Sequence, residues 1–221
     1  MPTLTDLLES RRSTRRFDPD RDVPGDVLER VLRAPLTMPH AGNTYDWRAL
    51  VLPRGERDPQ TWPKVFEALL SQSYVDEAAV VIVWTVQPHW WAEHYRRNIA
   101  DLVERGLLDP GRAGSLLDLA DSGPDAEFPL AGALAGEAMM GVAAAMLVAI
   151  DTGLGATVTA CRPALLARAL DLPDGALVLP FGVLALGHPA GGPPGRPAKP
   201  TLHDMYFENR WGEPLRAIEA R

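Results

Sequence analysis

Apolar positions recur along much of this chain with the spacing of helices. Leu4, Leu7 and Leu8 share one face of a first helix, which Thr3 can cap and which we expect to end near Ser13. The same spacing predicts helices at 24–35, at 62–70, in two polar pieces within 89–121, and at 163–170. The apolar faces of these helices are the first candidates for the core.

Other stretches have the composition of strands, at 48–52, 78–86, 156–160 and 176–186. The run at 78–86 is continuously apolar and rich in β-branched residues, which predicts a strand buried on both faces. Pro180 interrupts the last stretch and predicts an edge position or a bulge. Because helices and strands alternate without a regular βαβ pattern, an α+β domain is favoured over a doubly wound one.

The longest apolar stretch, 130–150, approaches the length of a membrane span. It carries Glu137, is rich in Ala and Gly, and ends at Asp151, so its uninterrupted part is only 138–150. We interpret it as a helix buried on all sides, either in the core of a soluble protein or at a subunit interface.

Residues 191–200 are dense in Gly and Pro and predict an extended segment without regular structure. Apolar and aromatic residues resume after it, at Met205, Tyr206, Phe207 and Trp211. A disordered tail would not keep such residues, so we expect this arm to pack on its own subunit or on a neighbour.

Composition narrows the classes of function. The 221 residues, 46% of them hydrophobic, suffice for one sizeable core, so we expect a single domain, 1–221, with a helical excursion at about 88–125. A net charge of -7 provides no electrostatic footprint for nucleic acid or an anionic membrane, and neither is an expected partner. A single cysteine, Cys161, and an N-terminus without the features of a signal peptide predict a cytoplasmic location.

Three segments carry candidate chemistry. Residues 11–17, RRSTRRF, place four arginines within six residues, and arginine forks and a serine hydroxyl match phosphate oxygens. An equally weighted alternative is a solvated helix end whose cations complement the helix dipole. The loop 38–47, MPHAGNTYDW, could receive a planar ring against its backbone amides, and 153–160, GLGATVTA, permits close backbone approach to a ligand. Taken singly, these last two are better read as an ordinary loop and a helix stop, and no GxGxxG motif indicates a Rossmann site.

In this order and spacing, the segments resemble the nitroreductase family of flavoproteins over nearly the whole chain. RRSTRRF is similar to the family's Arg-x-Ser-x-Arg/Lys-x-Phe segment, and MPHAGNTYDW to its Ala-Pro-Ser-x-x-Asn-x-Gln-Pro-Trp loop. AAAMLVAIDTGLGATV resembles its buried helix and Gly-Leu-Gly turn, and LDLPDGALVLPFGVLALGHP its Leu-Pro to Gly-x-Pro strand. GRPAKPTLHDMYFENRWG is similar to the basic, Pro-rich arm that closes many members.

The resemblance implies an α+β fold, a nitroreductase-like α/β sandwich whose central mixed, mostly antiparallel sheet is flanked by helices. It also implies a homodimer in which the subunits exchange terminal arms, here 191–221, and bury a long helix between them. Two FMN molecules would lie in that interface, and the excursion 88–125 would form a cover over the flavin. These implications agree with the separate interpretations of the segment 130–150 and of the arm.

The resemblance also assigns residues. Arg11, Arg12, Ser13 and Arg15 would hold the FMN phosphate and the N1/C2 carbonyl side of the ring, with Arg196 and Lys199 completing the phosphate site. Pro39, His40, Ala41 and Asn43 would line the flavin from one subunit, and Val158, Thr159 and Ala160 would approach N5 from the other. Gln72 or Ser73 would reach the ribityl chain or pyrimidine edge. Tyr45, Trp90 and Trp91 would belong to the substrate cover. No side-chain acid or base is required, because the flavin carries the chemistry.

The sequence departs from the family pattern at several positions. Tyr45 and Asp46 replace the Gln-Pro before the loop tryptophan, and His40 stands where serine is usual. His89 and His94 are five residues apart rather than the four that align two ligands on a helix, so no metal is expected there. Cys161 is interpreted as a small core residue, with thiol chemistry as the alternative.

Three functions follow from this reading. The leading one is an FMN-dependent oxidoreductase that passes hydride from NAD(P)H through flavin N5 to a small aromatic or quinone-like acceptor, such as a nitroaromatic or a quinone. The second is an oxidase or dehydrogenase of a biosynthetic intermediate, such as a cyclic dipeptide or an azoline ring, with oxygen as the final acceptor. The third is a protein that binds flavin without turnover.

Overall fold

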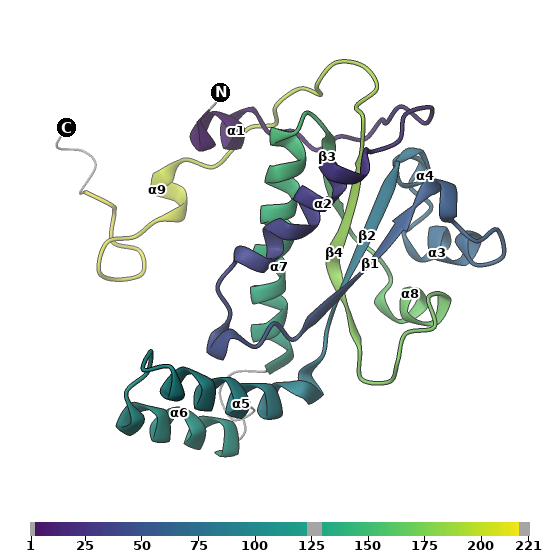
Figure 1. Ribbon diagram of the computed structural model, residues 1–221. Coiled ribbons are helices and arrows are strands. Elements are labelled where there is room, and N and C mark those ends of the chain that lie inside the picture. The colour runs from purple at the N-terminus through teal and green to yellow at the C-terminus, as the bar shows by residue number, and fades with distance from the viewer. Residues whose placement is uncertain (1–2, 123–129, 217–221) are drawn as a thin grey trace.

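The computed structural model describes residues 3–122 and 130–216 (Figure 1). Its α-helices and strands, in chain order, are α1 (Leu4–Ser10), α2 (Gly25–Arg33), β1 (Trp47–Pro53), α3 (Trp62–Ala68), α4 (Ser73–Glu77), β2 (Val80–Val86), α5 (Trp91–Glu104), α6 (Pro110–Ser122), α7 (Leu130–Asp151), β3 (Gly155–Thr159), α8 (Pro163–Ala169), β4 (Leu177–Gly187) and α9 (Leu202–Met205). Short 3₁₀ turns lie at η1 (Ala34–Thr37), η2 (Ala41–Asn43), η3 (Arg54–Glu56) and η4 (Pro88–Trp90). The predicted elements are present, with shifted ends.

The strands form one sheet in the order β1-β2-β4-β3 within the described residues, and neighbouring strands are antiparallel. Parallel pairing appears at an isolated bridge between Ser13 and Ala156, on the outer side of β3. Pro180 lies in β4, which is a central strand, so the edge alternative for this proline is wrong and the bulge alternative is confirmed. The register between β2 and β4 shifts beside Pro180, and a residue without an N–H is tolerated there because the ladder is interrupted.

The two faces of β2 belong to different cores. Val80, Ile82, Trp84 and Val86 pack in a cluster with residues of α2, α5 and α7, whereas alternate residues such as Val81 pack with α3, α4 and α8. Every residue of β2 is buried, which confirms the predicted strand buried on both faces. Figure 1 shows the resulting layers, with α7 on one side of the sheet and α3, α4 and α8 on the other.

Helix α7 is buried along one face only. Leu134, Ala138, Val142, Ala145 and Ala149 contribute to the core. The opposite side is exposed at a stripe that we call the open face of α7, formed by Gly132, Gly136, Met140 and Ala143. Burial on all sides is therefore not achieved within a single chain. By length and composition α7 could cross a membrane, but it packs on the sheet as a core helix does.

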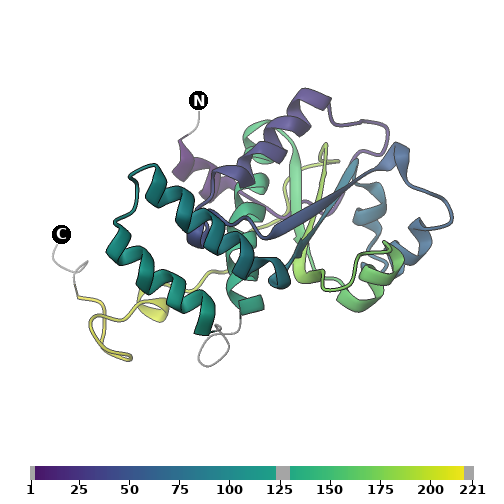
Figure 2. The same cartoon turned by 60° about the horizontal axis from the view of Figure 1, so that its bottom comes forward.

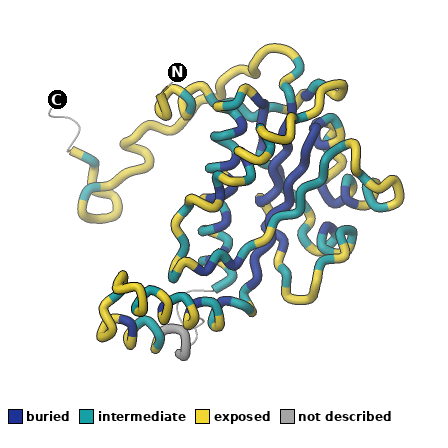
Figure 3. Tube along the Cα trace, viewed as in Figure 1, coloured by how far each residue is buried: buried dark blue, intermediate teal, exposed yellow. Residues whose placement is uncertain are grey.

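Two parts project from this body. Helices α5 and α6 run alongside each other at one end of the molecule (Figure 2), and we call this pair the cover after the predicted role of this excursion. The arm, residues 191–216, leaves β4, passes α1 and extends away from the sheet, and it is mostly exposed (Figures 1 and 3). Its tip is a hairpin in which Phe207 bridges Pro214 and the rings of Phe207 and Trp211 lie 4.7 Å apart. Trp211 is 92% exposed, so the aromatic tip is formed but uncovered.

Candidate functional site

The arginine segment, residues 11–17, leaves α1 and runs along β3 in an extended conformation. Helix α1 ends at Ser10, so the predicted end near Ser13 is wrong. Ser13 bridges Ala156, and the Thr14 N–H donates to the Ala156 carbonyl at 3.1 Å. Because β3 offers these backbone partners, the extended conformation replaces another turn of helix.

A glycine allows this close approach. A Cβ on Gly155 would lie 2.7 Å from both γ atoms of Thr14 and 2.9 Å from its Cβ, which is closer than van der Waals contact permits. Gly155 is therefore required by the position of the arginine segment, rather than only by the turn that precedes β3.

The other end of the arginine segment is fixed by three contacts. The Phe17 N–H donates to the Glu77 carboxylate at 3.0 Å, and the Phe17 ring is buried. The Ala190 N–H donates to the Arg16 carbonyl at 3.0 Å, and the Asp18 N–H to the His188 carbonyl at 2.8 Å. The segment is thus held against β3, α4 and the end of β4.

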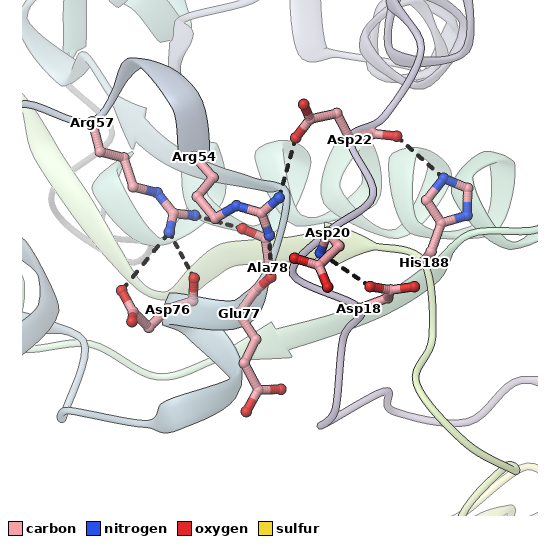
Figure 4. Close-up of polar contacts among 9 residues, drawn as sticks. All are labelled: Asp18, Asp20, Asp22, Arg54, Arg57, Asp76, Glu77, Ala78 and His188. Atoms are coloured by element: carbon pink, nitrogen blue, oxygen red, sulfur yellow. Dashed lines mark hydrogen bonds and ion pairs between the residues drawn. The ribbon is translucent and has the colours of Figure 1, made fainter.

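Glu77 is held in turn by a network around the carboxyl end of α4 (Figure 4). The Arg54 guanidinium donates to the Glu77 carbonyl at 3.0 Å and to the Asp22 carboxylate at 3.2 Å. The Arg57 guanidinium donates to the carbonyls of Asp76 and Ala78 at 2.9 and 2.7 Å. These contacts satisfy the carbonyls that a helix end leaves without partners.

The Arg57 side chain makes these contacts while almost completely shielded from solvent. Its side chain is 5% exposed and lies 3.8 Å over the ring of Trp62. Burial lowers the pKa of its guanidinium to about 10, against the smaller opposing effect of Asp76. No sequence pattern indicates this network, because Arg57 lies in a turn with ordinary polar composition.

The arginine segment lines a cavity of about 410 Å³. The walls come from three parts of the chain: Ser10, Arg11, Arg12, Ser13, Thr14, Arg15 and Arg16; Ile150, Leu154 and Gly155; and Pro189, Ala190, Gly191, Gly192, Pro193 and Pro194. Four of these residues are arginines and none is acidic. In a chain of net charge -7, the cavity is a local concentration of positive charge suited to an anion.

The arginines differ in what they contact. The Arg12 guanidinium donates to the carbonyls of Glu9, Ser10 and Arg11 at 3.0, 3.0 and 2.8 Å, so it caps α1. Arg15 and Arg16 are exposed at the cavity. Arg12 therefore completes a helix end, as the alternative interpretation of the motif expected, whereas the Arg11 guanidinium donates to Ser13 Oγ at 3.5 Å.

Two of the predicted site residues, Gln72 and Thr159, meet at the end of β3. The Gln72 side-chain amide donates to Thr159 Oγ1 at 2.7 Å, and the Tyr74 hydroxyl lies 2.8 Å from the same atom and also bonds the Gln72 amide oxygen. Leu70 and Ser71, just before Gln72, have left-handed φ angles of 64° and 51°. The structure thus brings Gln72 and Thr159 together, and it adds Tyr74, which sequence reasoning missed.

The loop 38–47 does not join this group in space and packs against α7 instead. The Ala41 N–H donates to Glu137 Oε1 at 2.8 Å. The Trp47 indole N–H donates to His40 Nε2 at 2.8 Å, so the His40 proton is on Nδ1, which donates to the Met38 carbonyl at 2.9 Å. The His40 ring also lies 4.1 Å from the ring of Tyr45. His40, where the family pattern has serine, is therefore held in one orientation by hydrogen bonds at both ring nitrogens.

One chain does not bring this loop to the cavity. Ala41 contacts α7 at Glu137, whereas Ile150 of the same helix lines the cavity. Thirteen residues of helix separate these two positions, which corresponds to roughly 20 Å along the axis.

The comparisons with known proteins agree with this architecture. The model of the nitroreductase family matches residues 8–188. The chain belongs to the nitroreductase family. Among curated proteins, an NADH dehydrogenase of Thermus thermophilus is 42% identical over 73 residues, which is 33% of this chain and 33% of that protein. The matched stretch therefore spans about a third of that relative.

Solved structures resemble this nitroreductase-family chain over most of its length. CLA-ER, an enone reductase of gut-bacterial fatty acid saturation, is 21% identical with a TM-score of 0.73, covering 94% of this chain and 98% of its own. A protein of Staphylococcus epidermidis named as an NAD(P)H:FMN oxidoreductase is 16% identical with a TM-score of 0.74 and coverages of 94% and 96%. A nitroreductase of Exiguobacterium sibiricum, solved with FMN, is 17% identical with a TM-score of 0.73 and coverages of 94% and 98%. At these identities the matches establish the fold.

The remaining residues suggested by the family resemblance are dispersed. Arg196 donates to the Glu9 carbonyl at the end of α1, and Lys199 is exposed on the arm; neither lines the cavity in the described part of the chain. Trp91 is 5% exposed and stacks on Tyr95, and Trp90 is half-buried with the Arg48 guanidinium 4.6 Å over its ring. Trp91 belongs to the core cluster on one side of the sheet and Trp90 contacts Arg48 of β1, so both attach the start of α5 to the sheet.

Asp46, His94 and Cys161 are other polar side chains that the sequence analysis singled out. Asp46, noted only as a departure from the family pattern, is buried and bonded to His94 of the cover. Among the described residues, no group of three His, Cys, Asp or Glu side chains could hold a metal ion. Burial raises the pKa of the Cys161 thiol to about 11, and its sulfur lies 3.5 Å from the Leu179 carbonyl.

Proposed function

We propose that this protein is an FMN-dependent oxidoreductase that transfers hydride from NAD(P)H to an electron-poor acceptor. The observation that carries the proposal is the cavity beside β3, where four arginines and no acid line the walls. Arg11, Ser13 and Arg15 would bind the FMN phosphate and the pyrimidine edge, with Arg12 holding the end of α1. FMN, when bound, supplies the hydride chemistry at its N5 atom.

The cavity's chemistry fits this cofactor. A phosphate dianion needs several hydrogen-bond donors and positive charges, which the arginine forks and the Ser13 hydroxyl supply. A positive group beside the pyrimidine edge would also stabilise the anionic reduced form of the ring. Val158, Thr159 and Ala160 would then face N5 through their backbone, and Gln72 would reach the cofactor only by leaving Thr159.

We propose further that the working unit is a homodimer. Pro39, His40, Ala41 and Asn43 lie roughly 20 Å along α7 from the cavity wall. A second copy could bring its own loop to this cavity if the open faces of α7 met. The exposed stripe on α7 and the uncovered aromatic tip of the arm both support this arrangement, because each would otherwise leave apolar surface in water. Arg196 and Lys199 on the arm would then contribute to a phosphate site after docking.

The acceptor is proposed by chemical class. Nitroaromatics, quinones and conjugated enones all accept hydride at an electron-poor centre, and each would need an open apolar space over the ring. In the proposed dimer, Tyr45 and the cover would border that space on the side of the loop 38–47. A cytoplasmic location, where NAD(P)H is available, fits this activity.

The test begins with an absorbance spectrum of purified protein before and after incubation with FMN, followed by anaerobic addition of NADH or NADPH. We expect a flavin spectrum that bleaches with one of the two nucleotides and recovers with a nitroaromatic, a quinone or an enone. Flavin that stays oxidised with both nucleotides would instead favour the dehydrogenase of a biosynthetic intermediate. Failure to bind FMN would refute the proposal.

Two variants make the test specific. Arg15→Ala should weaken FMN binding, whereas Arg33→Ala, on the exposed surface of α2, should not. Sedimentation of the wild-type protein should give twice the monomer mass, and Met140→Glu on the open face of α7 should shift it toward monomer and weaken FMN binding together.

A further inference from the structure

A carboxyl group is buried at the point where the loop 38–47 enters β1. The Asp46 side chain is fully buried, and its backbone carbonyl accepts the Gln87 N–H at 2.8 Å. A carboxylate in such a place is costly unless a donor compensates it. Its carboxylate Oδ1 lies 2.5 Å from Nδ1 of His94, and its other oxygen has no partner among the described residues. Among the described residues, Nδ1 of His94 is therefore the hydrogen-bond partner that offsets the cost of burying the Asp46 carboxyl group.

His94 belongs to α5, so this bond joins the cover to the loop. The same face of α5 makes two more contacts with the loop. The Asn98 side-chain amide donates to the Asn43 carbonyl at 2.7 Å. The Tyr95 ring packs directly on Gly42, so closely that a Cβ at this position would lie 2.5 Å from Tyr95 Cδ2. Positions 94, 95 and 98 lie on one side of a helix, and the loop covers that side.

The loop needs such support. Gly42, Asn43 and Tyr45 have left-handed φ angles of 57°, 54° and 51°, and two of them carry side chains that disfavour this conformation. On its other side the loop is held by the Ala41 contact with Glu137. A conformation of this kind persists only where contacts on several sides fix it.

The surroundings of His94 set its orientation. The Trp90 ring lies 5.8 Å from the His94 ring and 5.4 Å from that of His89, and the Arg48 guanidinium lies 4.6 Å over the Trp90 ring. The His94 side chain is 19% exposed. Its ring is thus packed from one side and directed at Asp46.

We propose that His94 is a positioning residue of the cover, and that its bond to Asp46 fixes the conformation of the loop that receives the flavin ring. The inference about the cofactor rests on the proposed function, whereas the coupling of cover and loop concerns this chain alone. His94 would influence substrate selection through the loop, because the loop backbone orients Tyr45, whose ring packs on that of His40.

The test is hydrogen exchange of the protein without added FMN, followed by FMN titration. In His94→Ala, exchange of the amides in 40–46 should accelerate about tenfold or more, because the buried carboxylate loses its donor. In His94→Asn, whose side-chain amide can donate from the place of Nδ1, exchange should remain close to wild type. Arg97→Ala, an exposed position of the same helix, is the matched control and should leave the loop unchanged.

The outcomes separate the two proposals. Unchanged loop exchange in His94→Ala, or His94→Asn behaving like His94→Ala, would overturn the positioning role. If the loop responds as expected but the wild-type protein binds no FMN, the coupling stands and the proposed function fails. If both hold, His94→Ala should weaken FMN binding about tenfold and His94→Asn should restore it. Melting curves identify a variant that has unfolded globally, and His94→Asn then decides the question.

Discussion

Replacing Gly155 with alanine tests whether the arginine segment depends on the closeness of its contact with β3. The new methyl group would lie 2.7 Å from the γ atoms of Thr14 and 2.9 Å from its Cβ. Rotation of the Thr14 side chain cannot relieve the contact with Cβ, so the segment must move by 0.5 to 0.7 Å to reach the ordinary 3.4 Å. That displacement would stretch the bond from the Thr14 N–H to the Ala156 carbonyl, now 3.1 Å, beyond hydrogen-bonding distance.

The two effects can be added. Overpacking costs about 1–3 kcal/mol and the lost hydrogen bond about 1 kcal/mol, so we expect Gly155→Ala to destabilise the fold by about 2–4 kcal/mol. For a chain of this size the melting temperature should fall by roughly 4–16 °C. FMN affinity should fall with it, because the donors of the segment would be displaced from the cavity.

Thermal melting and a fluorescence titration with FMN measure both consequences. Gly25→Ala is the matched control, since a Cβ at Gly25 meets nothing within 4 Å. Thr14→Gly in the Gly155→Ala background removes the three colliding atoms and should recover part of the loss. If Gly155→Ala melts and binds like the wild type, the segment is not held as tightly as the structure indicates.

Other predictions follow from single contacts. Glu77→Ala should cost about 1 kcal/mol in urea unfolding, because the Phe17 N–H loses its acceptor, and Glu77→Gln should restore most of it; equal losses in both would contradict the role of the hydrogen bond. Arg57→Lys should destabilise the protein by more than 1 kcal/mol in the same assay, since an ammonium cannot reach both carbonyls of the α4 end while stacking on Trp62, and a neutral result would count against the network. Burial raises the pKa of the Cys161 thiol from 9.0 to about 11, so below pH 9 it should react with a disulfide reagent about a hundredfold more slowly than a free thiol. The reaction rate should rise toward pH 11, and rapid labelling of the native protein below pH 9 would argue against the burial of this thiol.

Sequence patterns predicted the parts of this fold whose causes are local. The continuous apolar run of β2 indicated burial on both faces, and the Thr3 capping box is formed as the residues suggested. The arginine segment was identified because its charge contrasts with an acidic chain. Each of these features depends on residues that are close together in the sequence, so a sequence pattern can reveal it.

The parts that sequence reasoning missed depend on distant partners. Helix α1 stops at Ser10 because Ala156, far along the chain, offers backbone pairing to the next residues. Asp46 and His94 are 48 positions apart, and neither has a neighbour in sequence that indicates the bond between them. Spacing led only to a comparison of His94 with His89, and nothing in it pointed to Asp46. Such contacts become visible only when the sheet and the cover are placed in space.

The bridge between Ser13 and Ala156 has a consequence for solubility. Strand β3 lies at the edge of the sheet, and an edge strand with free backbone groups can pair with another chain and start aggregation. The arginine segment occupies part of that edge, and its charges repel a second copy that would approach in the same way. The arginine segment, which we propose to bind the cofactor phosphate, therefore also protects this edge of the sheet from pairing with another chain. Substitutions that detach it should produce aggregation at high protein concentration as well as weaker binding, and a bound anion should protect against both.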